Sequence, residues 1–136
     1  MPVVVSRNAP LVGRVLLAVI FIVAGLSKVF DWHGTAGYMA AQGLPAVPAL
    51  LFLTILTEVG GGVSLLVGFK TRWAAALLFG FLAVVTLAMH PFWGFEGQAQ
   101  QLQMTMFLKN LAIMGGLGYV VGQGSGPASV DARLAH

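Results

Sequence analysis

Long apolar stretches separated by short polar connections dominate the pattern of residues along the chain. Four of them lie at about residues 11–29, 49–69, 73–90 and 102–122. Each is close to the ~20 residues that a helix needs to cross ~30 Å of hydrocarbon. The pattern therefore predicts an all-α fold, an integral membrane four-helix bundle in which residues 1–136 form a single domain.

The first two apolar stretches each carry polar and small residues on one helix face. In the first stretch this face consists of Arg14, Ala18, Phe21, Gly25 and Lys28. In the second it consists of Thr54, Glu58, Gly61, Gly62 and Leu65. An ionised carboxylate at the centre of a bilayer costs about 2.5 to 3.5 kcal/mol. We therefore expect Glu58 to face protein and to have a charged partner or a proton.

The fourth stretch supplies a candidate partner for Glu58. Lys109 lies well inside it, beside Asn110, and is too deep to reach water cheaply. We predict that Lys109 is the counter-charge for Glu58. Arg14 and Lys28 lie nearer to the ends of their stretch, so an open alternative is that they extend to opposite membrane surfaces.

Two connections carry aromatic and polar residues that suit a membrane surface. Trp32 belongs at the headgroup level, and a short helix is predicted between Thr35 and Gly43, which is either a lid over the bundle or a connector. His90 ends the third stretch just before a proline, as an interface residue or as a ligand. The tail from Gln123 to His136 is expected to be exposed and mobile.

Composition supports a membrane location and excludes several chemistries. Of the 136 residues, 58% are hydrophobic and 8% are charged, against about 25% charged in soluble domains. The formal charge is +3, but the basic residues form no run, so the lipid bilayer and not nucleic acid is the expected partner. Without cysteine there is no disulfide, thiolate metal site or iron–sulfur cluster. We expect no metal site, and redox chemistry would need a bound cofactor or a partner.

The positions of the basic residues predict the orientation of the chain in the membrane. Those expected on one side are Arg7, Arg14, Lys70, Arg72 and Arg133. The other side carries Lys28 with Asp31 and Glu96. By the positive-inside rule, both termini are expected in the cytoplasm.

Several segments together resemble the DoxX family of small four-helix membrane proteins. They are Glu58 to Gly62, Gly68 to Arg72, Phe107 to Leu111 and Gly126 to Asp131, together with Arg14, Gly25, Lys28, His90 and Gly115-Gly116. The resemblance implies a multi-pass protein of the cell inner (plasma) membrane. It also implies links to thiosulfate:quinone oxidoreductase or quinol oxidase systems, or to thiol and oxidative-stress homeostasis. Distant relatives with a similar four-helix plan act in receptor or cargo assembly.

Three functions are compatible with these features. The first is an accessory or assembly partner of a soluble or membrane oxidoreductase. The second is a quinone-binding subunit of an oxidoreductase of the thiosulfate:quinone type. The third is a small proton-coupled transporter in which Glu58 exchanges protons. We favour the first, with no intrinsic cofactor, because a catalytic centre needs more convergent polar groups than this chain offers. Quinone is the ligand that the second function requires, and a homo-oligomer is compatible with all three.

The candidate site is a cluster of polar residues in the bundle: Arg14, Lys28, Glu58, His90, Lys109 and Asn110. Polar side chains in a bundle interior tend to mark ion or substrate paths. We therefore predict a pocket between the four helices that opens on the side opposite the termini and is covered by residues 32–45. The alternative is a packed core in which these groups only satisfy one another.

Overall fold

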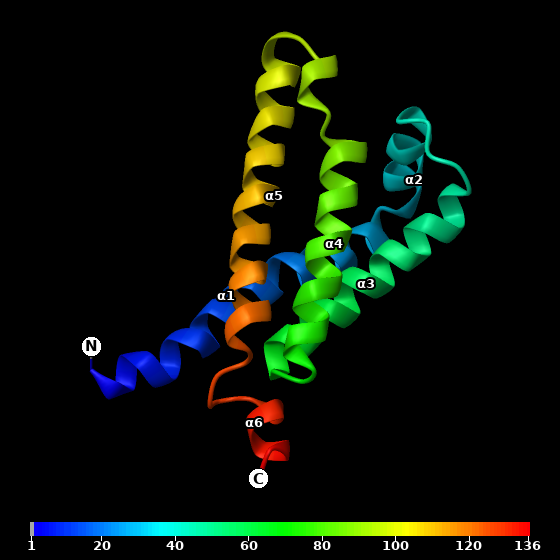
Figure 1. Cartoon of the computed structure of the whole chain (residues 1–136). Helices are drawn as coiled ribbons and strands as arrows, with labels where there is room; N and C mark the ends of the chain where they lie inside the picture. The colour runs from blue at the N-terminus through cyan, green and yellow to red at the C-terminus, as the bar shows by residue number, and fades with distance from the viewer. Residues whose placement is uncertain (1) are drawn as a thin grey trace.

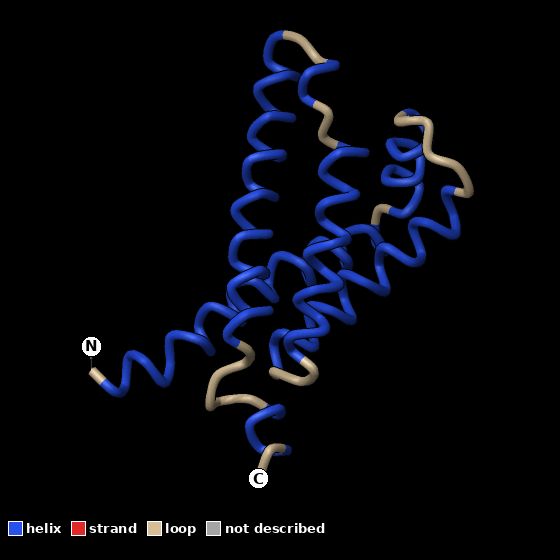
Figure 2. Tube along the Cα trace, in the orientation of Figure 1, coloured by secondary structure: helices blue, strands red, loops and turns tan. Residues whose placement is uncertain are grey.

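A computed structural model describes residues 2–136, in which the four apolar stretches form four long helices (Figure 1). They are α1 (Val3–Phe30), α3 (Val47–Val67), α4 (Thr71–Met89) and α5 (Gly97–Gln123). All four are long and apolar enough to cross a membrane. The described residues contain no strand (Figure 2), so the predicted all-α, four-helix membrane fold is confirmed.

Three short helical segments lie in the connections. They are α2 (Trp32–Ala41), the single 3-10 turn η1 (Phe92–Gly94) and α6 (Val130–Leu134). We call the end of the bundle where α1 and α4 stop, and α3 and α5 begin, the lid end, because α2 lies there. The opposite end, with the turn between α3 and α4 and with α6, is the tail end.

All four long helices begin earlier than predicted, α3 and α4 by two residues and α1 and α5 by more. α1 starts at Val3, eight residues before the expected start, because Pro2 precedes its first turn and the apolar residues after it continue the helix through Pro10. α5 starts at Gly97, so the glutamines expected in a connection are helical, in keeping with the good helix propensity of glutamine.

The long helices are arranged as two pairs. α1 packs mainly against α3, and α4 packs mainly against α5. In Figure 1 the first pair runs diagonally across the second, and the pairs meet toward the tail end and diverge toward the lid end. The buried hydrophobic core consists of Ala18, Phe21, Leu65, Ala75, Leu78, Leu82 and Leu117. Because the pairs diverge, space is left between them at the lid end.

Glycines allow α1 and α3 to approach each other closely. A Cβ atom added at Gly25 would lie 2.6 Å from Val59 Cγ2, and one added at Gly62 would lie 2.8 Å from Ile22 Cγ1. The predicted interior face of α1 is correct, since Arg14, Ala18, Phe21 and Gly25 are all buried. This close contact determines which charged residue reaches Glu58.

Candidate functional site

An ion pair between Lys28 of α1 and Glu58 of α3 forms the base of the candidate site. Lys28 Nζ lies 3.0 Å from one carboxylate oxygen of Glu58 and donates a hydrogen bond of 3.1 Å to the other. It also lies 3.4 Å from the carbonyl oxygen of Ala24. The Glu58 side chain is 6% exposed and that of Lys28 is 26% exposed. The ammonium thus uses its donors on the carboxylate and on its own helix.

The predicted pair between Glu58 and Lys109 is wrong. Lys28 follows Gly25 by one turn on the same face of α1, so the close approach at Gly25 brings Lys28 to Glu58. The pair of Lys28 with Glu58 is the only ion pair within residues 2–136. Lys109 is exposed on α5, and its Nζ lies 3.5 Å from Met106 Sδ on the same helix.

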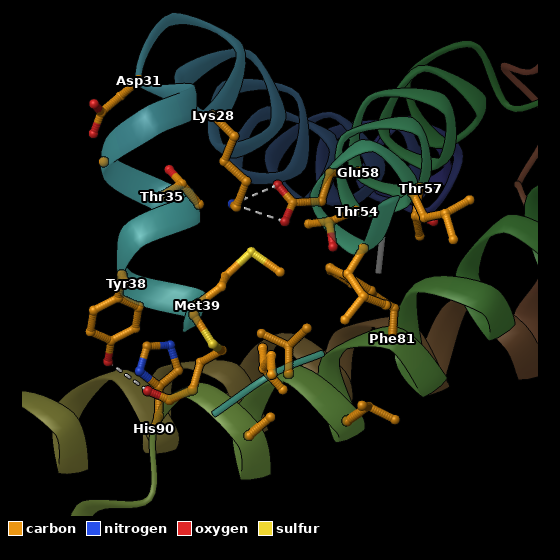
Figure 3. Close-up of a pocket in the computed structure, with 18 residues that line it drawn as sticks. Lys28, Asp31, Thr35, Tyr38, Met39, Thr54, Thr57, Glu58, Phe81 and His90 are labelled. Carbon is orange, nitrogen blue, oxygen red and sulfur yellow. Dashed lines mark hydrogen bonds and ion pairs between the residues drawn. The ribbon is translucent and has the colours of Figure 1, made fainter. Parts of the chain in front are cut away.

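A pocket of about 570 Å³ opens above this ion pair, between α2, α3 and α4 (Figure 3). Its polar or ionisable lining residues are Lys28, Asp31, Thr35, Tyr38, Thr54, Thr57, Glu58 and His90. The remainder of its lining is Gly34, Met39, Leu44, Leu50, Leu53, Phe81, Val84, Val85, Ala88 and Met89. This size and mostly apolar lining are typical of small-molecule sites. Arg14, Lys109 and Asn110 do not line it.

The helix α2 covers the pocket and is joined to the α4–α5 pair through Tyr38. The Tyr38 hydroxyl donates to the carbonyl oxygen of Met89, and accepts a hydrogen bond from Gln103 Nε2. Gln103 Oε1 lies 2.7 Å from His90 Nδ1. In Figure 3, Tyr38 and His90 lie at the far side of the pocket from the Lys28–Glu58 pair, with Met39 between them. The position of α2 is therefore that of a lid.

This chain of hydrogen bonds defines the hydrogen positions on His90. Because the Tyr38 hydroxyl donates to a carbonyl, the group that approaches its oxygen must be the amide N–H₂ of Gln103. The amide oxygen then faces His90 and can only accept, so Nδ1 of His90 carries hydrogen. In the neutral ring Nε2 remains as an acceptor.

Asn110 belongs to a separate buried contact between α4 and α5. Its side-chain amide donates a 3.1 Å hydrogen bond to the hydroxyl of Thr86. Both residues are buried, with exposed fractions of 5% and 2%. This hydrogen bond joins two buried polar groups, so the contact ties the helix pair together.

Arg14 lies at the tail end, where it holds the C-terminal tail. Its guanidinium donates to the carbonyl oxygen of Leu65 at 2.8 Å and to that of Ala128 at 2.6 Å. Gly68 ends α3 in a left-handed conformation with φ of 73°, and a Cβ there would collide with Ser129 and Arg14. Arg14 thus joins the end of α3 to the tail.

The expectation that the tail is exposed is wrong for Ser129, which is buried, and hydrogen bonds of Ala128 and Asp131 tie this part of the tail to the bundle. The Asp131 carboxylate accepts hydrogen bonds from the backbone N–H groups of Lys70 and Thr71, at 2.7 and 2.9 Å, at the start of α4. Burial alone would raise the pKa of Asp131, but these hydrogen bonds outweigh it and hold the pKa below its usual value. The composition of the tail did not indicate that Asp131 would cap the start of α4, because the two lie 60 residues apart in the sequence.

Several lining residues were missed because nothing local distinguishes them. Tyr38 and Met39 come from α2, and they meet α3, α4 and the Tyr38 partner Gln103 of α5 only because the chain folds back over the diverging helix pairs. The one usable signal was the short helix predicted near Thr35. Within residues 2–136 no three His, Asp or Glu side chains are grouped so that they could hold a metal ion.

The helices and the buried polar pair define a small multi-pass membrane protein, and comparison with known proteins specifies its class. The family model described as DoxX matches residues 9–91, and the chain belongs to the DoxX family. The inner membrane protein YqjF of Escherichia coli (strain K12) is 38% identical over 124 residues, which are 91% of this chain and 90% of that protein.

Two further relatives extend the comparison. The inner membrane protein YphA of Escherichia coli (strain K12) is 30% identical over 123 residues, which are 90% of this chain and 88% of that protein. The ER-derived vesicles protein ERV29 of Saccharomyces cerevisiae is 26% identical over 121 residues, which are 89% of this chain but 32% of that protein. No solved structure matches the chain.

Proposed function

We propose that this protein is an accessory subunit of a membrane-associated redox system, and that it holds a quinone-type ligand in the pocket beneath α2. The observation that supports this proposal is the pocket of about 570 Å³, with apolar walls and polar groups at opposite sides. A quinone combines an apolar tail with carbonyl oxygens, so it matches such a lining. Lys28 would turn the N–H that now points to the Ala24 carbonyl oxygen, 3.4 Å away, to one quinone carbonyl, and His90 would accept from a hydroxyl of the reduced form.

The charges of the pocket favour a neutral ligand over a small sulfur anion. Its lining includes one cation, Lys28, and two carboxylates, Asp31 and Glu58. Lys28 is already paired with Glu58. An anion such as thiosulfate would have to displace a carboxylate from the ammonium and face a second one at Asp31. A neutral quinone can enter without breaking the ion pair.

The pocket and its surroundings favour a role in ligand binding over catalysis or transport. The pocket contains no thiol and no cluster of three potential metal ligands among the described residues, so electrons would pass between the ligand and a partner oxidoreductase. Proton-coupled transport would need Glu58 to open toward both surfaces. On its tail-end side, however, Gly61, Gly62 and Leu65 are buried against neighbouring helices.

We also propose that the protein resides in the cell inner membrane with both termini in the cytoplasm, so that the pocket opens at the opposite face. Arg7, Lys70, Arg72 and Arg133 all lie toward the tail end, which supports this orientation. A fusion reporter placed after His136 tests it. A reporter that is active only outside the cytoplasm would reverse the orientation and leave the pocket proposal intact.

Ligand binding is tested with protein purified in mild detergent. We expect quinone in an organic extract of the native protein, and we expect a short-chain quinone to quench tryptophan fluorescence on titration. Val85→Phe should abolish binding because Val85 lines the pocket. Leu87→Phe is the matched control, since Leu87 lies on the same helix but is exposed and outside the pocket.

The outcomes separate the parts of the proposal. Loss of binding in Val85→Phe but not in Leu87→Phe supports the pocket as the ligand site. A stoichiometric oxidoreductase that co-purifies, identified by mass spectrometry, supports the accessory role. If the native protein carries no quinone, binds none on titration and co-purifies with no such enzyme, the proposal is wrong.

A further inference from the structure

Lys109 is an exposed cation in the middle of a membrane-spanning helix. It lies 12 residues after the start of α5 at Gly97, which is about 18 Å along the helix axis. No carboxylate of the chain pairs with it within residues 2–136, where the only ion pair is that of Lys28 with Glu58. Asp131 caps α4 at the tail end, and Asp31 and Glu96 lie in the connections at the lid end. Its counter-charge must therefore come from outside the chain.

The depth of Lys109 places its ammonium within reach of the headgroups at the lid end. α5 has 27 residues, about 40 Å, which exceeds the ~30 Å of the hydrocarbon by about 10 Å. The glutamines up to Gln103 occupy this excess at the lid end, so the Lys109 Cα lies about 9 Å inside the hydrocarbon. Helix side chains lean toward the N-terminus, and the contact with Met106 shows that Lys109 does so.

A row of polar side chains leads from Lys109 to the membrane surface. It consists of Gln98, Gln101, Thr105 and Lys109, all exposed and at steps of three, four and four residues. Leu102 and Leu108, exposed by 55% and 56%, flank the row. A polar row between large apolar side chains suits a headgroup that descends beside α5 while its acyl chains cover the leucines.

Two other occupants fit this surface less well. Close packing of a second helix needs small residues, but the exposed glycines of α5, at 115, 118 and 122, all lie nearer the tail end than Lys109, and Gly116 packs against Leu17 of α1. A second copy related by an axis normal to the membrane would place one Lys109 opposite the other. Neither a second helix packed on the glycines nor a second copy of the chain would bring a carboxylate of this sequence to the depth of Lys109.

We propose that the row ending at Lys109 binds the phosphate of an anionic phospholipid in the leaflet at the lid end. Lys109 provides the charge, and Thr105 and Gln101 provide hydrogen-bond donors nearer the surface. The Thr105 hydroxyl now donates to the Gln101 carbonyl oxygen within the helix and would turn to the phosphate. This site is distinct from the pocket beneath α2 and does not depend on what the pocket binds.

The test is a comparison of lipid binding by native mass spectrometry. The purified protein is titrated with phosphatidylglycerol and, separately, with phosphatidylethanolamine. We expect one tight phosphatidylglycerol site in the wild type. Lys109→Met should weaken it roughly fivefold, the factor that one cation near an anionic surface contributes, and Lys109→Arg should retain it. Lys70→Met, which removes an exposed cation at the tail end, is the control and should leave the tight site unchanged.

Two results would overturn the proposal. One is equal phosphatidylglycerol binding by the wild type and Lys109→Met. The other comes from a photoreactive residue at Ala112, exposed on the same side of α5. If it forms adducts in native membranes mainly with a protein whose span carries Asp or Glu, or with a second copy of this chain, then protein and not lipid covers Lys109. Lipid adducts that disappear in Lys109→Met would support the proposal.

Discussion

Removing one partner of the Lys28–Glu58 ion pair should destabilise the protein more than removing both. At 3.0 Å and an effective dielectric constant of 20, the attraction is about 5 kcal/mol before the cost of desolvation. Breaking a buried pair on one side costs about 3 to 5 kcal/mol. Lys28→Met leaves a carboxylate that is 6% exposed, whereas Glu58→Gln leaves an ammonium that is 26% exposed and can move toward water. We therefore expect Lys28→Met to have the larger effect.

Thermal unfolding in detergent, followed through the three tryptophans, measures these effects. A loss of 1 kcal/mol corresponds to roughly 2 to 6 °C for domains near this size, so Lys28→Met should lower the midpoint by on the order of 10 °C. The double change should recover a substantial part of the loss, giving a coupling of about 1 to 3 kcal/mol. Lys109→Met combined with Glu58→Gln is the control and should be additive. If the losses of stability from Lys28→Met and Glu58→Gln are additive, or if Lys109→Met and Glu58→Gln are coupled, then Lys28 is not the partner of Glu58.

Three further predictions concern packing, pH and the lid. Gly25→Ala should lower the unfolding midpoint, because its Cβ would lie 2.6 Å from Val59 Cγ2, whereas Gly13→Ala, with no atom within 4 Å, should not. Hydrogen bonds lower the pKa of Asp131, so their contribution to holding the tail is complete above the unfolded-state pKa of about 4 and is lost as pH falls through the folded-state pKa. Protease cleavage of the tail should therefore become faster in acid. A cleavage rate that does not depend on pH would contradict this. Tyr38→Phe removes the hydrogen bonds that hold α2, so a cysteine placed at position 50 in the pocket should react faster with a maleimide, and an unchanged rate would show that packing alone holds the lid.

The fold could be predicted because membrane helices leave a strong signal in a single sequence. A run of about 20 apolar residues matches the thickness of the hydrocarbon, and the interior face of α1 followed from the spacing of Arg14, Ala18, Phe21 and Gly25. The short helix before the second span was also visible, through the Gly43 and Pro45 that follow it, although it begins at Trp32 and not at the predicted Thr35. Each of these features depends on residues that are close together in the sequence.

The pairing of charges could not be predicted, because it depends on which helices are neighbours. Lys109 was predicted as the partner of Glu58 because the two residues lie at similar depths in the membrane. Similar depth does not bring two residues together when their helices are not neighbours. The close approach of α1 and α3 at Gly25 and Val59 brings α1 and not α5 to the carboxylate. The ordered tail was missed for a related reason. Its Gly-Ser-Gly-Pro composition is typical of flexible segments, but its partners are backbone groups of Gly68, Lys70 and Thr71.

The contacts of Arg14 also constrain the order in which the protein is completed during synthesis. Its guanidinium binds the carbonyl of Leu65, 51 residues later, and that of Ala128, 114 residues later. Chains emerge from the ribosome with the N-terminal part first, so the first helix enters the bilayer before either acceptor has been made. Until then, Arg14 must keep its charge at the lipid surface. We therefore expect the full set of Arg14 hydrogen bonds to form only when the end of the chain has left the ribosome.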